Sequence, residues 1–192
     1  TILKTIFNFT GGGTGFEVWD ASFLAIADVA LVGTAGGDGI SVQDLSRLLC
    51  TGVVGLVGWG NGLLVIESGN AVIVNLSVSG CTAGTSAANC SSINIYHGNL
   101  CGNVTGSITD RTSAMTMGGN STVSGNTTGI YAKNNSFFSF SDATTLNVTG
   151  NTTGVSFGYQ SYWGGTGLTL SDNGTDMLPD SAYQAGTVSR TG

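Results

Sequence analysis

The sequence predicts an all-β chain folded as a right-handed parallel β-helix, a β-solenoid of about eight coils of roughly 24 residues. Three observations predict this fold. Apolar and polar residues alternate in short runs, turn-forming residues separate the runs, and similar segments recur at a spacing of one coil. An antiparallel β-sandwich of many short strands is the rival fold, but a sandwich does not need a regular repeat.

The repeat is clearest in the C-terminal half. Residues 125–130 match residues 150–155 at an offset of 25, and residues 172–177 form a weaker copy 22 residues further on. A solenoid stacks equivalent segments above one another. Asn126 and Asn151 are therefore expected to stack and to satisfy each other's amide groups.

The N-terminal half also repeats. Residues 23–33 resemble residues 70–80 at an offset of 47, which is the length of two coils, and residues 47–58 align with both from the coil between them. Residues 42–49 are the best helix candidate, but they fit the alignment better as a strand and a turn. The alignment predicts one inward column of Ile26, Cys50 and Ile73, a second of Val29, Val53 and Leu76, and a bend of Asp28, Gly52 and Asn75 between them.

Residues 1–177 are expected to form one β-helix domain, in which 1–15 includes a strand that caps one end. Residues 178–192 hold the single proline and little apolar pattern, so they are expected to be a tail or linker. The open ends of a solenoid expose unpaired backbone groups. We therefore expect the chain to assemble with copies of itself or to be part of a longer polypeptide.

Composition narrows the classes of function. Charged residues are 8% of the chain, the net charge is −6, and the five basic residues are scattered, so nucleic acid is not an expected partner. Apolar runs break well before about 18 residues, which argues against a membrane span. The sequence has no phosphate-binding loop and no zinc-ligand spacing, and we expect neither a cofactor nor a metal.

Two features resemble a known family. Residues 38–42 and 61–65 resemble the Asp-Gly-Ile strand openings of pectate-lyase-like right-handed β-helices, and residues 123–155 resemble the repeats of bacteriophage tail fibres and tailspikes. The resemblance covers roughly residues 16–177. It implies host-surface recognition at the virion surface, by a homotrimer bound to a polysaccharide or another surface glycan.

Four polar side chains are candidates for chemistry. Asp20, Asp44 and Glu67 each end a short strand at offsets of 24 and 23, and the alignment adds His97 to the same column by treating 81–90 as an inserted loop. Paired carboxylates at about 5–9 Å are what glycoside hydrolysis needs, so Asp44 and Glu67 are the candidate catalytic pair. The favoured alternative is that acidic groups at strand ends cap turns and keep the surface soluble. A polysaccharide lyase is a less favoured function. Such an enzyme usually has a basic residue near its carboxylates, and Arg47 is the single candidate here.

Aromatic residues form a second candidate site, because glycine-flanked tryptophans and tyrosines in turns can stack on sugars. Packing at a coil edge or between subunits is an equally good explanation. The expected glycan-binding set is Trp19, Trp59, Tyr159, Tyr162 and Trp163, and Tyr131 is a further aromatic candidate for the same face.

Ten of the fifteen asparagines lie in Asn-x-Ser/Thr sequons, against about four expected by chance. Either the protein is a glycosylated extracellular protein, or the turn chemistry of the coils generates sequons as a by-product. The candidates are Asn8, Asn75, Asn89, Asn103, Asn120, Asn126, Asn134, Asn147, Asn151 and Asn173.

The four cysteines are Cys50, Cys81, Cys90 and Cys101. Cys81 and Cys90 flank a polar segment and are the candidates for a disulfide, with reduced and buried thiols as the alternative.

The first expectation for function is therefore a non-enzymatic segment of a virion appendage that contacts host glycans. A secreted or cell-surface N-glycosylated or filament-forming protein comes second, and a glycan-degrading enzyme third.

Overall fold

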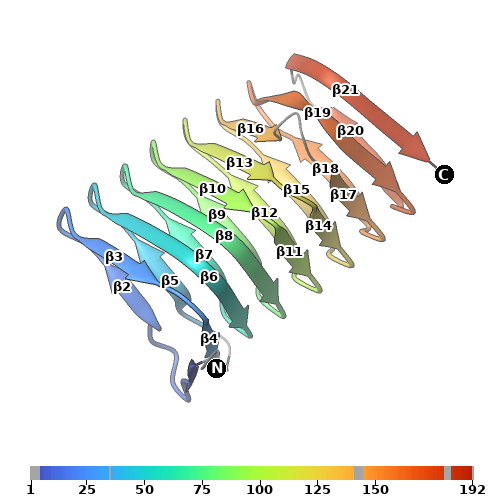
Figure 1. Cartoon of the computed structure of the whole chain (residues 1–192). Helices are drawn as coiled ribbons and strands as arrows, with labels where there is room; N and C mark the ends of the chain where they lie inside the picture. The colour runs from blue at the N-terminus through green and yellow to red at the C-terminus, as the bar shows by residue number, and fades with distance from the viewer. Residues whose placement is uncertain (1–4, 35, 141–144, 180–182, 192) are drawn as a thin grey trace.

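The computed structural model describes residues 5–34, 36–140, 145–179 and 183–191. Within these ranges the chain is an all-β parallel solenoid of about seven turns of roughly 23 residues, without a helix. The predicted fold class is confirmed, and the predicted eight coils are close. Figure 1 shows the coils stacked in sequence order from one end of the rod to the other.

One face of the rod is an eight-stranded sheet to which each coil contributes one strand. Its members pair in parallel with the equivalent strand of the next coil. In order they are β2 (Phe16–Val18), β5 (Asp38–Val42), β7 (Asn61–Val65), β9 (Ala83–Ala87), β12 (Thr105–Thr109), β15 (Thr128–Ala132), β18 (Thr153–Phe157) and β20 (Thr175–Pro179).

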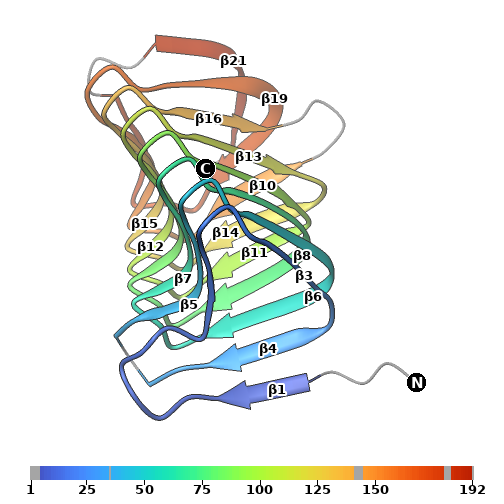
Figure 2. The same ribbon diagram turned by 90° about the vertical axis from the view of Figure 1, so that its left-hand side faces the viewer.

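The rest of each coil belongs to a 13-stranded sheet that bends around the rod, opposite the first sheet (Figure 2). In some coils a single long strand passes through the bend, and in others two shorter strands meet there. Its strands are β1 (Thr5–Asn8), β3 (Phe23–Ile26), β4 (Val29–Val32), β6 (Arg47–Val57), β8 (Asn70–Ser79), β10 (Ser92–Tyr96), β11 (Gly98–Cys101), β13 (Ala114–Gly118), β14 (Ser121–Ser124), β16 (Phe137–Phe140), β17 (Leu146–Thr149), β19 (Tyr162–Ser171) and β21 (Tyr183–Thr191).

The two ends of the chain continue the same ladder. β1 pairs in parallel with β4 and is the first strand of the sheet, and β21 pairs in parallel with β19. The segment 178–192, predicted as a tail or linker, therefore contains the end of β20 and a nine-residue strand.

Apolar side chains stack inside the rod because strand residues alternate between the two faces of a sheet. The predicted inward column of Ile26, Cys50 and Ile73 is confirmed by the strand register. The second column is wrong by one residue, because Val54 and not Val53 lies between Val29 and Leu76. The register shifts between Cys50 and Val53, and this irregularity turns Val53 outward.

Polar residues at two corners form internal ladders. At one corner the backbone N–H groups of Asn103, Asn126 and Asn151 donate to the side-chain oxygen of the next asparagine at 2.8–3.0 Å, so that the ladder ends at Asn173. The ladder begins at Cys81, whose N–H donates to Asn103 Oδ1 at 3.0 Å. The repeat of residues 125–130 and 150–155 thus arises from a buried hydrogen-bonded column, as the sequence predicted for Asn126 and Asn151.

Serines form the equivalent ladder at the corner that follows the eight-stranded sheet. The N–H of Ser22 donates to Ser46 Oγ at 3.1 Å, and that of Ser91 donates to Ser113 Oγ at 3.2 Å. The buried members of this column are Ser46, Ser91, Ser113, Ser136 and Ser161.

Candidate functional site

Directly before the serine ladder, the chain makes the same sharp turn in successive coils. In six of these coils two consecutive residues of the turn adopt left-handed backbone angles, as Asp44 (φ 54°) and Leu45 (φ 61°) do, and in the last coil Gln160 alone does so. Asn and Asp tolerate this conformation better than most residues. We call the column of first turn residues the turn edge; from N- to C-terminus its members are Asp20, Asp44, Glu67, Asn89, Arg111, Asn134 and Tyr159.

The stacking of Asp20, Asp44 and Glu67 agrees with the sequence alignment. The N–H of Ala21 donates to the carbonyl of Asp44 at 2.9 Å, and the N–H of Leu45 donates to that of Glu67 at 3.2 Å. The three acidic side chains are exposed. The Asp44 carboxylate accepts a hydrogen bond from protonated Glu67 and adds a negative charge beside it, and both effects raise the pKa of Glu67 above its ordinary value.

His97 does not belong to this column, so that part of the alignment is wrong. It lies at the bend between β10 and β11, where its N–H donates to the carbonyl of Gly118. The small and polar residues of 81–90 suggest an inserted loop in the sequence, but the structure has none there. They form β9 and a normal turn, so that Asn89 follows Glu67 after 22 residues.

Trp19 is an exposed apolar residue beside the carboxylates of Asp20, Asp44 and Glu67. Its side chain is 59% exposed, and it lines a shallow hollow of about 530 Å³ together with the acidic residues. The other lining residues are Asp20, Ala21, Asp44, Leu45 and Glu67.

The setting of these carboxylates is more open than that of a glycosidase pair. Catalytic carboxyl groups stand about 5–9 Å apart around the scissile bond and are shielded from water. Asp44 and Glu67 both lie exposed to solvent, and the influence of Asp44 raises the pKa of Glu67. Among the described residues, no cluster of His, Cys, Asp or Glu is suited to hold a metal ion.

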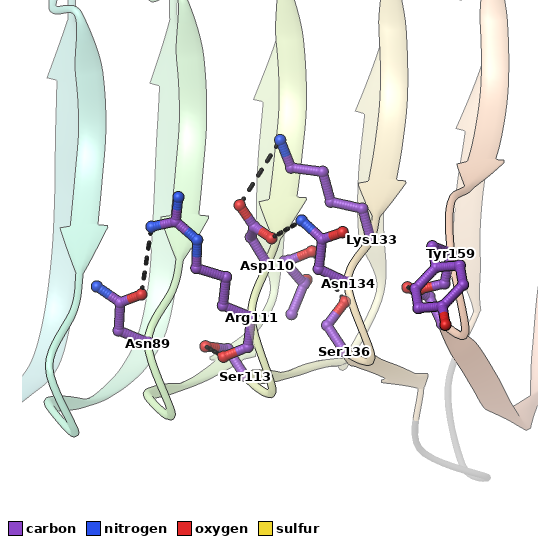
Figure 3. Close-up of polar contacts among 10 residues, drawn as sticks. Asn89, Asp110, Arg111, Ser113, Lys133, Asn134, Ser136 and Tyr159 are labelled. Atoms are coloured by element: carbon purple, nitrogen blue, oxygen red, sulfur yellow. Dashed lines mark hydrogen bonds and ion pairs between the residues drawn. The ribbon is translucent and has the colours of Figure 1, made fainter.

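Further along, the turn edge becomes basic (Figure 3). Arg111 Nη1 donates to Asn89 Oδ1 at 3.4 Å. Asp110 accepts a hydrogen bond from Asn134 Nδ2 at 2.8 Å and lies 3.6 Å from Lys133 Nζ. Lys133 also lies 5.3 Å from the ring centroid of Tyr131. The charge of Asp110 is therefore balanced within its own chain.

The expectation that Trp59 is exposed in a turn is wrong. Its side chain is 1% exposed, its Nε1 donates to the carbonyl of Leu31 at 3.2 Å, and its ring makes an edge contact with Phe9. A Cβ atom on Gly33 would lie 2.6 Å from the Trp59 ring. Neighbouring glycine thus makes room for a buried indole, and it does not mark an exposed loop.

Trp163 is buried in the same way. It lies within β19 and stacks on Phe140 and Phe157, with ring centroids 5.5 and 6.3 Å away. Neither Trp59 nor Trp163 can therefore contact a glycan on the surface of this solenoid.

The three exposed members of the predicted glycan-binding set, Trp19, Tyr159 and Tyr162, lie at three separate places. Trp19 and Tyr159 are exposed near opposite ends of the turn edge. Tyr162 is 43% exposed on the outer surface of the 13-stranded sheet, where its ring packs on Phe137 with centroids 4.9 Å apart. The sequence did not single out Phe137, although the alternation of 137–140 places it outward.

The Phe137–Tyr162 pair borders a row of hydroxyl groups on the same outer surface. Ser139 lies two residues after Phe137 and forms a 2.7 Å hydrogen bond with Thr116 of the preceding coil. Asn94, one coil before Thr116, lies beside it in strand register. The aromatic pair and these polar groups are called the outer aromatic face below.

Most of the sequons are products of the two ladders. Asn103, Asn126 and Asn151 are buried, and their side-chain amides donate to buried carbonyls; Asn126 is 3% exposed. Asn173 continues the ladder, half-buried. Two residues after each of them stands a threonine of one stacked column, Thr105, Thr128, Thr153 or Thr175.

Two further sequons come from the turn edge. Asn89 and Asn134 occupy left-handed turn positions, and Ser91 and Ser136 of the serine ladder follow two residues later. The remaining four, Asn8, Asn75, Asn120 and Asn147, match the number of about four expected by chance. The excess of sequons is therefore explained by turn chemistry.

The predicted disulfide between Cys81 and Cys90 is absent, and all four cysteines are free. The two residues lie at opposite ends of β9. Cys81 is buried, and its Sγ accepts the backbone N–H of Trp59 at 3.4 Å, at the position where later coils use an asparagine oxygen. Cys90 is exposed in the turn.

Comparisons with known proteins give no relative for this chain: no protein-family model, no curated protein and no solved structure matches it. Among the described residues, no helix has the length and apolar character to cross a membrane.

Proposed function

We propose that this chain is a non-enzymatic structural solenoid of a surface appendage, of the bacteriophage tail-fibre or tailspike type that its coils resemble. In this proposal it lies at the virion surface, associates with copies of itself, and contacts cell-surface glycans. Its polar turn residues support a structural role, because the asparagine and serine ladders use them for internal hydrogen bonds.

The outer aromatic face carries the glycan part of the proposal. Sugars bind to proteins through stacking of their apolar faces on aromatic rings, combined with hydrogen bonds to polar groups. Tyr162 and Phe137 offer adjacent rings on a sheet surface, and Ser139 and Thr116 offer hydroxyl groups beside them. This arrangement suits an extended polysaccharide more than a small molecule in a cavity.

An enzymatic function receives less support. The candidate pair Asp44 and Glu67 lies open to solvent, so it lacks the enclosure that strengthens catalytic electrostatics. A secreted glycoprotein is the second candidate, and the exposed sequons at Asn8, Asn120 and Asn134 favour it.

The test is binding of the purified protein to a panel of immobilised bacterial capsular and lipopolysaccharide glycans. Loss of one stacking ring removes about 0.5–1.5 kcal/mol, so Tyr162→Ala should weaken binding roughly three- to tenfold. Trp19→Ala is the control, because Trp19 is also an exposed aromatic residue but lies at the turn edge, away from the outer aromatic face. Equal affinities of the two variants, or no glycan bound by the unsubstituted protein, would contradict the proposal.

A further inference from the structure

The turn edge separates charge along its length. Its first three members are the carboxylates Asp20, Asp44 and Glu67, the fourth is neutral Asn89, and the fifth is Arg111. Lys133 adds a second positive charge one coil later, and it offsets Asp110. The edge is therefore acidic in its first three coils, neutral at Asn89, and positively charged at Arg111 in the fifth.

The acidic half lacks a counter-charge of its own. In the part of the chain that the structure describes, none of the three carboxylates takes part in an ion pair, and Arg47 on the following strand forms none with them. Asp44 raises the pKa of Glu67, first through a hydrogen bond and then through its negative charge. Arg111 has only a long hydrogen bond of 3.4 Å to Asn89. Both halves thus present charge that a partner can neutralise.

The order of residues is self-complementary about Asn89. Counting outward from it, Glu67 corresponds to Arg111, Asp44 corresponds to Asn134, and Asp20 corresponds to Tyr159. Successive coils are about 4.8 Å apart, so the steps in the two directions are equal. A two-fold axis through Asn89 would bring all of these pairs into register at once.

We propose that two copies of this chain associate side by side in antiparallel orientation through the turn edge, with the two-fold axis at Asn89. Glu67 of each copy pairs with Arg111 of the other, and Asp44 accepts a hydrogen bond from the Asn134 amide of the other. Such an isologous interface forms every contact twice.

The hollow beside Trp19 fits this arrangement. It lies at the acidic end of the edge, where the exposed ring of Tyr159 from a second copy arrives. Trp19 and Leu45 are exposed in the single chain, and the tyrosine ring would cover them. Apolar contacts at both ends thus flank the ion pairs at the centre.

The contact is small and charged. Seven coils make an edge about 29 Å long, which is shorter than most stable dimer interfaces require. The dimer is therefore expected to be of low affinity and to weaken as salt screens its ion pairs. The two-fold arrangement differs from the threefold assembly that the family resemblance implies. It also leaves the outer aromatic face free, so this inference and the glycan proposal can fail separately.

Charge exchange tests the proposal directly. By analytical ultracentrifugation at low salt and high protein concentration, we expect a species of twice 19.3 kDa. Glu67→Arg and Arg111→Glu should each shift the population to monomer, and the double variant should restore the dimer. Asp172→Arg, an exposed acidic residue outside the turn edge, is the matched control and should remain dimeric.

Cys90 provides a second, independent readout. It follows Asn89 and is exposed, so in the proposed dimer the two Cys90 thiols lie beside the axis. Cys50 and Cys81 are buried, and burial raises the pKa of the Cys50 thiol to about 12. A short bis-maleimide should therefore give a covalent dimer that Cys90→Ser abolishes and Cys101→Ser retains. A monomer at all concentrations, a trimer, or assembly unaffected by Glu67→Arg would overturn the proposal.

Discussion

The backbone N–H and the side-chain Nδ2 of Asn126 both donate to Oδ1 of Asn151, each at 2.9 Å. Asn126 Nδ2 also donates to the carbonyl of Leu100, and Asn126 Oδ1 accepts the N–H of Asn103. One buried side chain therefore links three successive coils. The asparagine ladder holds the corner of the solenoid together, where ordinary strand pairing is interrupted.

Asn126→Ala should consequently destabilise the protein by about 2–4 kcal/mol, because it leaves buried donors and acceptors without partners. Asn120→Ala provides the control, since Asn120 is exposed and should change stability by no more than about 0.5 kcal/mol. The free energy of unfolding from urea titration measures both. Equal stability of the two variants would show that the ladder contributes little.

Substitution of the buried Trp59 and of the exposed Trp19 should change the free energy of unfolding by different amounts. Trp59→Ala removes a buried ring and leaves the Leu31 carbonyl without its hydrogen bond, so a loss of about 3–5 kcal/mol is expected. Trp19→Ala removes an exposed ring and should change the free energy of unfolding by less than about 1 kcal/mol. A large loss for Trp19→Ala would mean that this residue packs against something in the folded single chain.

The contact between Asp44 and Glu67 predicts a pH dependence. The pKa of Glu67 is raised above its ordinary value of 4.5, so the folded state binds this proton more tightly than the unfolded state does. Protonation of Glu67 thus favours folding, and its contribution is lost as the pH rises through the raised pKa. Because Glu67 is fully exposed, the effect on stability is small and the titration itself is the better observable.

Asp44→Asn should lower the pKa of Glu67 toward 4.5, because it replaces the carboxylate that accepts the Glu67 hydrogen bond and removes the neighbouring negative charge. The measurement is a carbon-13 NMR titration of the Glu67 carboxyl group at low salt. Asp172→Asn, which changes an exposed carboxylate elsewhere, should leave the titration unchanged. An unaltered Glu67 titration in Asp44→Asn would show that the two carboxyl groups do not interact.

The fold class could be predicted from the sequence because a solenoid places similar residues at equivalent positions of successive coils. The match between residues 125–130 and 150–155 exists because each position has the same neighbours in successive coils. The same logic gave the column of Ile26, Cys50 and Ile73 and the stack of Asp20, Asp44 and Glu67.

The errors occurred where one coil departs from that regularity. Val53 was placed inward because its sequence shows alternation but not the register shift after Cys50. His97 was added to the acidic column because β9 contains small and polar residues that resemble a loop. Trp59 was expected at the surface because flanking glycines indicate turns, whereas the structure uses nearby Gly33 to accommodate its ring. Such packing depends on the adjacent coils and is not encoded locally.

We expect the asparagines of this chain to build the solenoid and not to carry glycans. The most direct test is the intact mass of the native protein, before and after enzymatic deglycosylation. We expect 19.3 kDa in both cases. A larger mass that falls on treatment, with glycans mapped to Asn103, Asn126 or Asn151, would contradict both the buried ladder and the proposed virion location.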